Sequence, residues 1–491
     1  MGIFMQKKRS TVFLLFIIGI IFASCGSNET GKIPVTTNSK EALKFYLKGR
    51  DLLERLRYQE AREYFEKALN EDPDFALAHL HKGMITFGST DFTQEIKKAV
   101  SLIDRISHGE RLKILGMEAF ANRLPMKERE YYQTLVEEFP NDERAHLLLG
   151  NHYFFQAEYN KAIGSYRRAT EINAKYSPPY NQLGYSHRYL ENYEEAKEAF
   201  KTYTKLIPDD PNPYDSYADL LMKMGNFEKS IKTFKKALKQ DPSFFSSVIG
   251  IANNLNLLGQ HESARDRIRE ALETTSARAE IRALKYTIAI SYIDQGNIEH
   301  GLRVLEGVYD MDKQLNDPSR TAEDLIYIAA LQTEMGDYKE ASLKYKQALQ
   351  LIEDSALSNE RKENFRRIFL YRNAKLALAQ KNVKEAKKYT GKFKQSIEGV
   401  KDRIRTWNYH ELLGLIAMEE QKYDEALGEL RRSSFHNPNI YLQMAIASYK
   451  KGDRSKAIKF CEKAVNFNGI NNLNYAMIRM KATQFLEKLR S

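Results

Sequence analysis

The sequence is short of the residues that break a chain or cross-link it. It has only 12 prolines and 25 glycines in 491 residues, whereas Ala, Leu, Glu and Lys are abundant. Such a composition favours helix nearly throughout. Cys25 and Cys461 are the two cysteines, so a disulfide framework is excluded. Cys461 falls at a position that the repeats described below fill with an apolar residue, and we expect it to be a buried thiol.

Motifs for catalysis and metal binding are also missing. The ten histidines have no metal-binding spacing, and His410-Glu411 lacks the second histidine of a zinc-protease helix. The chain has no glycine-rich phosphate loop, no Gly-x-Ser-x-Gly turn and no cysteine pair. We therefore predict no cofactor, no metal ion and no enzymatic activity. Only distant side chains converging in a groove could supply a catalytic site.

Charge of one sign does not dominate the chain. The formal net charge of +11 includes Lys7, Lys8 and Arg9, which we expect to be removed; because no acid precedes Cys25, their loss leaves +8. This excess is spread among interspersed acidic residues, which favours a mixed-charge surface over a nucleic-acid footprint. We expect no nucleic-acid partner. Hydrophobic residues at 42% and charged residues at 29% are typical of a globular protein.

Residues 1–24 have the plan of a secretory signal. A basic start is followed by an apolar run from Val12 to Phe22 and then by Ala23 and Ser24. The run is about half of the roughly 20 residues that a membrane-spanning helix needs. Met5 is an alternative start. Phe22-Ala23-Ser24-Cys25 resembles a bacterial lipobox, apart from Phe22 where Leu is usual, and the resemblance implies cleavage before Cys25 and its acylation. An ordinary secretory signal is the alternative.

Residues 25–41 are predicted to be the lipidated cysteine and a flexible tether, because the stretch is polar and poor in helix formers. By the same resemblance, Gly26 after the cysteine favours sorting to an outer membrane. We therefore expect a lipid-anchored protein of the bacterial cell envelope, on the periplasmic side of the outer membrane. The inner membrane and the cell surface remain alternatives.

One pattern repeats through the rest of the chain, with a period of 34 residues at first and 31 to 45 later. A small residue marks the first helix of each unit, and a second small residue usually follows twelve positions later, three positions after an aromatic residue. The first small residues are Gly49, Gly83, Gly116, Gly150, Gly184, Ala218, Ala252, Ala289, Ala329, Ala374, Gly414 and Ala445.

This helix–turn–helix period resembles the tetratricopeptide repeat. The resemblance implies an all-α fold, a right-handed α-solenoid of about twelve repeats with a C-terminal capping helix. We predict a regular 34-residue array over residues 42–278, a longer-period array over 279–471 and the capping helix over 472–491. Whether the arrays form two blocks or one spiral is left open.

In tetratricopeptide arrays the first helices line a concave groove, and the resemblance implies which side chains face a ligand. Asparagine amides suit a peptide backbone, and aromatic rings add flat contact area. The alternative is that these side chains are solvated or pack against neighbouring helices. The candidates are Arg144, Asn151, Phe154, Phe155, Asn181, Tyr185, Arg188, Tyr189, Asp215, Asp219, Met222, Asn253 and Asn256.

We predict from these features a non-enzymatic, membrane-anchored lipoprotein scaffold. Its partner would be a protein or peptide segment bound in the groove, in envelope assembly or secretion. The alternative is an envelope binding protein for a glycan, peptidoglycan or lipid. The carboxylate clamp of chaperone-binding relatives is absent. Leu147 precedes Asn151 and Met117 follows Lys113, so neither Asn151 nor Lys113 has the second residue that the clamp requires.

Overall fold

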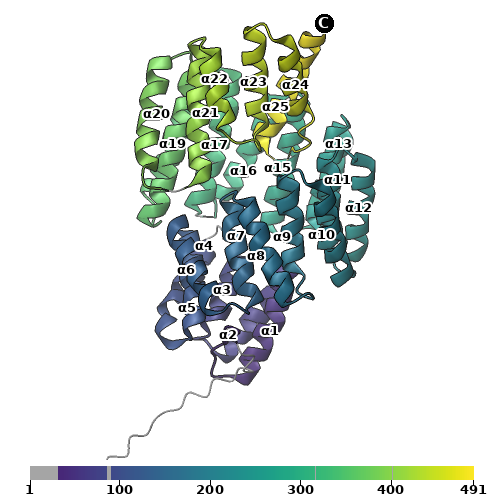
Figure 1. The fold of residues 1–491 in the computed structure, drawn as a ribbon, viewed down its shortest axis with the longest axis vertical. Helices are drawn as coiled ribbons and strands as arrows, with labels where there is room; N and C mark the ends of the chain where they lie inside the picture. The colour runs from purple at the N-terminus through teal and green to yellow at the C-terminus, as the bar shows by residue number, and fades with distance from the viewer. Residues whose placement is uncertain (1–30, 86–89, 316, 401, 471) are drawn as a thin grey trace, which may run out of the picture.

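The structure is a computed structural model that describes residues 31–85, 90–315, 317–400, 402–470 and 472–491. These residues form 25 α-helices and one short 3₁₀ helix, η1 (Ile103–Arg105), and no strand (Figure 1). The all-α prediction is therefore confirmed. The predicted signal at residues 1–24 and the predicted lipidation site Cys25 lie outside the described residues.

The helices form twelve antiparallel pairs, numbered here as units 1 to 12, and a final helix. Units 1–7 are α1 (Lys40–Glu54) with α2 (Tyr58–Glu71), α3 (Ala76–Ile85) with α4 (Thr90–Ser101), α5 (His108–Ala121) with α6 (Pro125–Glu138), α7 (Glu143–Phe155) with α8 (Tyr159–Ile172), α9 (Pro178–Tyr189) with α10 (Tyr193–Leu206), α11 (Asn212–Lys223) with α12 (Phe227–Gln240), and α13 (Phe245–Leu257) with α14 (His261–Thr274). Units 8–12 are α15 (Arg278–Asp294) with α16 (Ile298–Lys313), α17 (Pro318–Met335) with α18 (Tyr338–Glu353), α19 (Asn359–Ala379) with α20 (Val383–Ile397), α21 (Arg403–Glu419) with α22 (Tyr423–Arg431), and α23 (Pro438–Lys450) with α24 (Arg454–Val465); α25 (Leu473–Arg490) follows.

Where the first helix of a pair carries glycine at the small position, the two helices cross closely at that residue. A Cβ atom on Gly184 would lie 2.5 Å from the ring of Phe200, sixteen residues later in the partner helix. The same spacing places Gly150 against Tyr166 and Gly116 against Tyr132. Phe200 and Tyr166 are fully buried, so the absent glycine side chain is replaced by a ring from the second helix. This contact brings the two backbones together and fixes the shape of a unit.

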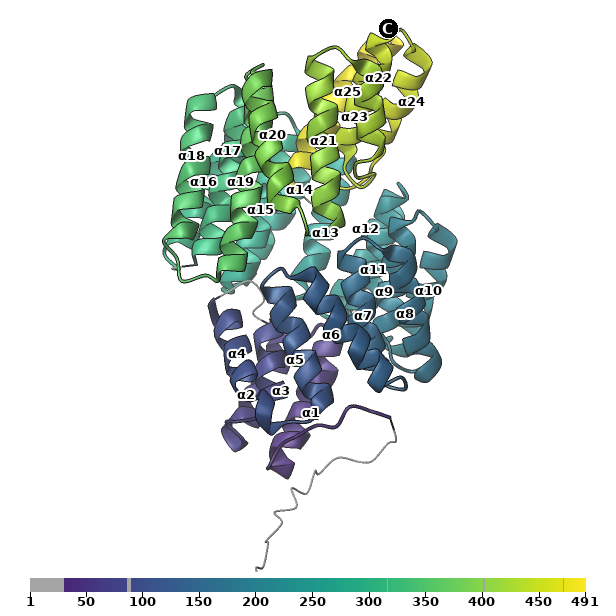
Figure 2. The same ribbon diagram turned by 60° about the vertical axis from the view of Figure 1, so that its left-hand side comes forward.

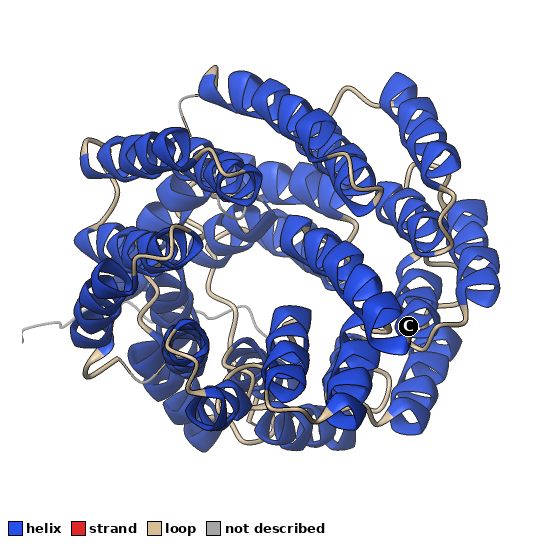
Figure 3. Ribbon diagram, turned by 90° about the horizontal axis from the view of Figure 1, so that it is seen from above, coloured by secondary structure: helices blue, strands red, loops and turns tan. Residues whose placement is uncertain are grey.

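The units wind through more than one turn of a superhelix, and the second turn rests on the first (Figures 2 and 3). The hydroxyl of Ser358, in unit 10, donates to the Asn122 side-chain oxygen of unit 3 over 2.8 Å. A guanidinium N–H of Arg403, in unit 11, donates to the carbonyl of Ala157 in unit 4 over 3.0 Å. The separation is seven units in both cases. The arrays are therefore one continuous spiral rather than two separate blocks.

The final helix, α25, covers more than an exposed end. It packs against α24, as a cap would, and also against α15 of unit 8. Its Leu473 and Met477 join a buried cluster with Ala289 of α15. Arg479 donates to the Asp294 carboxylate over 2.6 Å and to the Leu257 carbonyl over 2.9 Å. The helix thus ties the end of the second turn to units 7 and 8.

Residues 31–39, here called the strap, differ from the flexible tether predicted over 25–41. The strap runs across the starts of the first helices, and its backbone N–H groups donate to three acids. The bonds join Ile33 to Asp142 (3.0 Å), Thr36 to Glu110 (2.8 Å) and Asn38 to Asp72 (3.2 Å). The prediction failed here because polar composition does not reveal acceptors that lie 34 to 109 residues further along the chain.

A first prediction tests the helix crossing. Gly184→Ala should lower the free energy of unfolding by about 1–3 kcal/mol, because its Cβ would overlap the Phe200 ring. Gly164→Ala, on the exposed side of α8 with nothing within 4 Å, should instead stabilise the helix by about 0.5–1 kcal/mol. Urea unfolding followed by circular dichroism measures both. Equal effects of the two substitutions would contradict the proposed role of the crossing.

A second prediction concerns the strap. Glu110 is fully buried and accepts bonds from the Thr36 N–H and hydroxyl and from Ser107. Glu110→Ala removes these acceptors and should destabilise the N-terminal units by about 1–3 kcal/mol. We expect the Thr36 amide to exchange its hydrogen much faster than in the wild type, whereas exposed Glu41→Ala leaves it protected. Unchanged protection of Thr36 in Glu110→Ala would show that the strap is held by other contacts.

Candidate functional site at the seam between the superhelical turns

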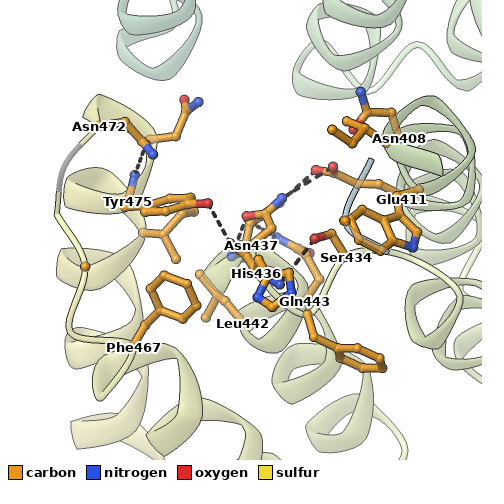
Figure 4. Close-up of a pocket in the computed structure, with 18 of the residues that line it drawn as sticks. Asn408, Glu411, Ser434, His436, Asn437, Leu442, Gln443, Phe467, Asn472 and Tyr475 are labelled. Atoms are coloured by element: carbon orange, nitrogen blue, oxygen red, sulfur yellow. Dashed lines mark hydrogen bonds between the residues drawn. The ribbon is translucent and has the colours of Figure 1, made fainter. Parts of the chain in front are cut away.

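A cavity of about 630 Å³ lies where the second turn meets the first. Units 4, 5 and 6 supply one wall through the ends of α7, α9 and α11. Units 10, 11 and 12 and α25 supply the opposite wall, part of which is drawn in Figure 4. We call this space the seam cavity. It exists only because units seven positions apart come together.

The buried carboxylate of Glu411 organises one side of the seam cavity. It accepts bonds from the Tyr371 hydroxyl (2.8 Å), the Lys375 ammonium (3.1 Å) and the side-chain amides of Asn437 (3.4 Å) and Asn439 (3.3 Å). Burial acts to raise the pKa of Glu411, but the Lys375 charge and the donors hold it below its usual value. The carboxylate is therefore ionised and fully occupied. It fixes the wall rather than serving as a base.

An aromatic cluster joins the two turns beside the cavity. The rings of Tyr159 and Tyr189 stack with centroids 4.9 Å apart, and His436 from the second turn meets their edges at 5.4 and 5.1 Å. The Trp407 ring lies 6.3 Å from His436. Burial, together with the nearby charges of Lys223 and other cations, lowers the pKa of His436 to about 4. His436 is therefore neutral at pH 7 and packs as an aromatic ring.

Three large apolar side chains remain exposed around the seam cavity. Phe155 and Phe435 each keep 53% of their surface exposed, and Ile404 keeps 45%. They come from the end of α7, the loop before α23 and the start of α21. Exposed large apolar groups that gather at one cavity mark a binding surface more often than isolated ones do.

Two cations in the seam cavity have no acidic partner. Lys223 donates to the carbonyl of Phe467 and lies over the Phe467 ring, and Arg372 lies over the Tyr371 ring. Neither forms an ion pair with any residue that the structure describes. Burial and the repulsion from Arg188 lower the pKa of Lys223 to about 8, which still leaves it mostly charged at pH 7. These two cations can therefore pair with an acidic ligand group, although Glu191 in the same lining also lies near Lys223.

The predicted groove residues do not form one site. Phe155 and Arg188 line the seam cavity, together with Phe154 and Tyr189, whereas Arg144 and Asn151 line a separate cavity near the N-terminus. Arg188 pairs with Asp219 at 3.5 Å and lies over the Tyr185 ring.

The remaining predicted residues lie on the inner side of units 5 to 7 and are largely buried. Asp215 accepts a bond from the Ser247 hydroxyl over 2.7 Å, and burial raises the pKa of Asp215 to about 7. Asn181 and Asn253 are buried, and their side-chain oxygens have no hydrogen-bond partner. Their polar atoms could accept bonds from a ligand, and their role stays a prediction.

The predicted groove residues include none from the second-turn half of the cavity. They all lie within residues 143–278, a range that excludes Trp407, Glu411, Phe435 and His436. The same positions of unit 11 hold Asn408, Glu411 and Leu415, which line the cavity, so extending them to the later repeats identifies this wall, although not the single tryptophan, Trp407. No sequence signal pairs His436 with Tyr189, because that contact depends on the superhelical pitch.

The residues that the structure describes contain neither a membrane-spanning helix nor a metal-binding cluster. None of their helices combines the length and the apolar composition that crossing a bilayer requires. Nor do they place three or more His, Cys, Asp or Glu side chains so as to hold a metal ion.

Comparison with protein families identifies the repeat. Two family models described as tetratricopeptide repeat match residues 46–104 and 115–178, and residues 177–210, 212–244 and 438–471. These matched segments are tetratricopeptide repeats. Proteins built from tetratricopeptide repeats commonly mediate protein–protein interaction and are typically non-enzymatic adaptors. The paired helices between the matched segments extend the same architecture, so the fold is an α-solenoid of helical repeats.

Several solved structures are similar to parts of the chain, and two of them are described as tetratricopeptide repeat proteins. TTC0263 from Thermus thermophilus is 20% identical over 44% of this chain and 98% of its own, with a TM-score of 0.29. YrrB, described as having an unusual peptide-binding site, is 18% identical over 38% and 94%, with a TM-score of 0.26. MamA from Desulfovibrio magneticus is 13% identical over 34% and 97%, with a TM-score of 0.30. No curated protein matches the chain.

Proposed function

We propose that this chain is a lipid-anchored scaffold of the bacterial envelope that binds a partner protein in the seam cavity. One observation carries the proposal: the exposed Phe155, Ile404 and Phe435 gather at one cavity beside two cations without acidic partners. The binding function agrees with the common role of tetratricopeptide repeats. The envelope location rests on the signal and the lipobox-like Cys25 in the sequence.

The composition of the seam cavity defines the partner segment. An aromatic or aliphatic side chain would cover Phe155 and Phe435, and an adjacent Asp or Glu would meet Lys223 and Arg372. Asn408 and Asn474, which also line the cavity, carry amides that can bond the peptide backbone. A volume of about 630 Å³ is within the range of ligand pockets and admits a short segment rather than a folded domain.

A glycan is the second candidate. The sole tryptophan, Trp407, and the tyrosine pair Tyr159 and Tyr189 offer flat faces near amide side chains. The tyrosine faces are already stacked on each other, however, and Arg403 lies over Trp407 at 5.0 Å. We therefore favour the peptide segment.

A third prediction tests the anchor. Radiolabelled palmitate supplied to cells should label the wild-type protein and not Cys25→Ser, because only the wild type has a thiol at residue 25 that can accept the lipid. Cys461→Ser is the matched control and should label like the wild type, since the Cys461 thiol is buried. Equal labelling of Cys25→Ser and wild type would remove the lipid anchor from the proposal.

A fourth prediction tests the seam cavity. A photo-crosslinking amino acid at Phe155 or Phe435 should capture the same partner in intact cells, whereas one at Leu343, which is 43% exposed on α18, should not. Mass spectrometry of the crosslinked peptide should find an apolar residue next to Asp or Glu. Lys223→Glu should reduce the captured amount at least about tenfold, a loss of about 1.4 kcal/mol.

The outcomes separate the candidates. Equal capture at Leu343, or a crosslinked segment without acidic residues, would contradict the seam cavity as a peptide site. The glycan candidate replaces the peptide segment if two results are obtained together. The crosslinker at position 155 captures no protein, and the purified protein binds peptidoglycan fragments in a manner that depends on Trp407.

A further inference from the structure

A second polar site lies on the inner side of units 1–4, away from the seam cavity. Two cavities of about 220 and 190 Å³ share three cationic residues from three helices, Arg50 of α1, Lys113 of α5 and Arg144 of α7. Residues 32–35 of the strap line the smaller cavity. We call the two spaces together the N-terminal cavity.

Lys113 is the unusual residue of the N-terminal cavity. Only 8% of its surface is exposed, yet it forms no hydrogen bond or ion pair with the residues that the structure describes. A buried ammonium without a partner is costly, and buried charges are normally paired. Lys113 therefore offers three unused donors to the N-terminal cavity.

Arg50 adds a second cation without an acidic partner. Its guanidinium lies over the Tyr46 ring and makes no ion pair within the described chain. Arg144, by contrast, donates to both oxygens of Glu54, over 2.7 and 3.1 Å, and to Glu143. Glu54 is thereby already paired.

The remaining nearby acid, Asp142, is also occupied. One of its oxygens caps α7 by accepting from the Arg144 and Ala145 N–H groups, and the other accepts from Ile33 of the strap. The acids around the cavity thus have partners, whereas the charges of Lys113 and Arg50 are not neutralised by direct contact.

Neutral groups complete the site. His81 is 6% exposed, and its Nδ1 has no hydrogen-bond partner; the fully buried Tyr46 hydroxyl has none either. The two rings stack with centroids 5.4 Å apart, and they belong to the linings of the larger and the smaller cavity, respectively. Buried polar atoms without partners usually have a ligand or water that satisfies them.

We propose that the N-terminal cavity binds a phosphate group through Lys113 and Arg50, with His81 and Tyr46 as neutral partners. An ammonium and a guanidinium together suit phosphate, whose several oxygens accept more bonds than a carboxylate can. The small volume fits the phosphate group itself rather than a large molecule around it. The phosphate belongs to a free orthophosphate ion or to a phosphate monoester. This site is independent of partner binding at the seam.

The pH dependence follows from Lys113 and the groups that face it. Burial lowers its pKa to about 8; Asp142 and Glu54 act to raise it, and Arg50 and Arg144 act to lower it further. The pKa of His81 lies well below its usual value because of burial and these cations, so His81 stays neutral near pH 7. Phosphate binding should therefore be strong near pH 7, where Lys113 is mostly protonated, and should weaken as the pH rises through about 8 and Lys113 loses its proton.

The test is isothermal titration of the full chain in detergent with inorganic phosphate and, separately, with O-phosphoserine. We expect saturable binding to the wild type at pH 7 and at least about tenfold weaker binding to Lys113→Met. Lys44→Met, on the exposed face of α1, should bind like the wild type. Circular dichroism establishes that each variant is folded; if Lys113→Met is not, Arg50→Gln takes its place with the same expected loss.

Each outcome decides the proposal. The proposal is supported if the wild type loses phosphate affinity between pH 7 and 9 and the folded Lys113→Met variant shows no such loss. If inorganic phosphate binds more tightly than O-phosphoserine, the ligand is the free ion. If O-phosphoserine binds more tightly, the ligand is a phosphate monoester. No saturable binding of either probe to the wild type up to about 10 mM, or equal binding by Lys113→Met, would overturn it.

Discussion

The close approach of two helices inside each unit is the constraint on which the structure depends. Where the first helix carries glycine, as at Gly150 and Gly184, a ring from the second helix occupies the space of the missing side chain. This contact sets the distance and the angle between the helices of a unit. Because every unit must bury its remaining apolar face against the next, a small fixed rotation is repeated along the chain. A superhelix follows.

The rotation per unit then creates the seam. Units seven positions apart meet, and the second turn bonds to the first through Ser358 and Arg403, while α25 closes onto α15. The seam cavity is therefore a property of the whole spiral. A change of a few degrees per unit would accumulate over seven units and separate its walls, so alterations of packing far from the cavity should affect binding.

The two candidate sites differ in the kinds of interaction that they offer a ligand. The seam cavity combines exposed apolar groups with two cations that have no acidic partner among the described residues, and these features suit the proposed protein segment. The N-terminal cavity is small, and its main feature is a buried lysine without a counter-charge. The strap links the second site to the N-terminal segment, because Ile33 and Lys32 bond to the start of α7 beside Arg144. If Cys25 is acylated, only residues 26–30 separate the lipidated cysteine from the strap.

Interactions between residues close in sequence were predictable from the sequence by itself. The pattern of small residues and aromatic residues determined the helices, their pairing into about twelve units and the α-solenoid. It also identified Phe155 and Arg188, which line the seam cavity. Only the tertiary structure decided which distant units meet, that His436 lies against Tyr189, and that residues 31–39 form a strap instead of a free tether. The physical reason is that helical periodicity is encoded within each unit, whereas the seam arises from a small rotation summed over seven of them.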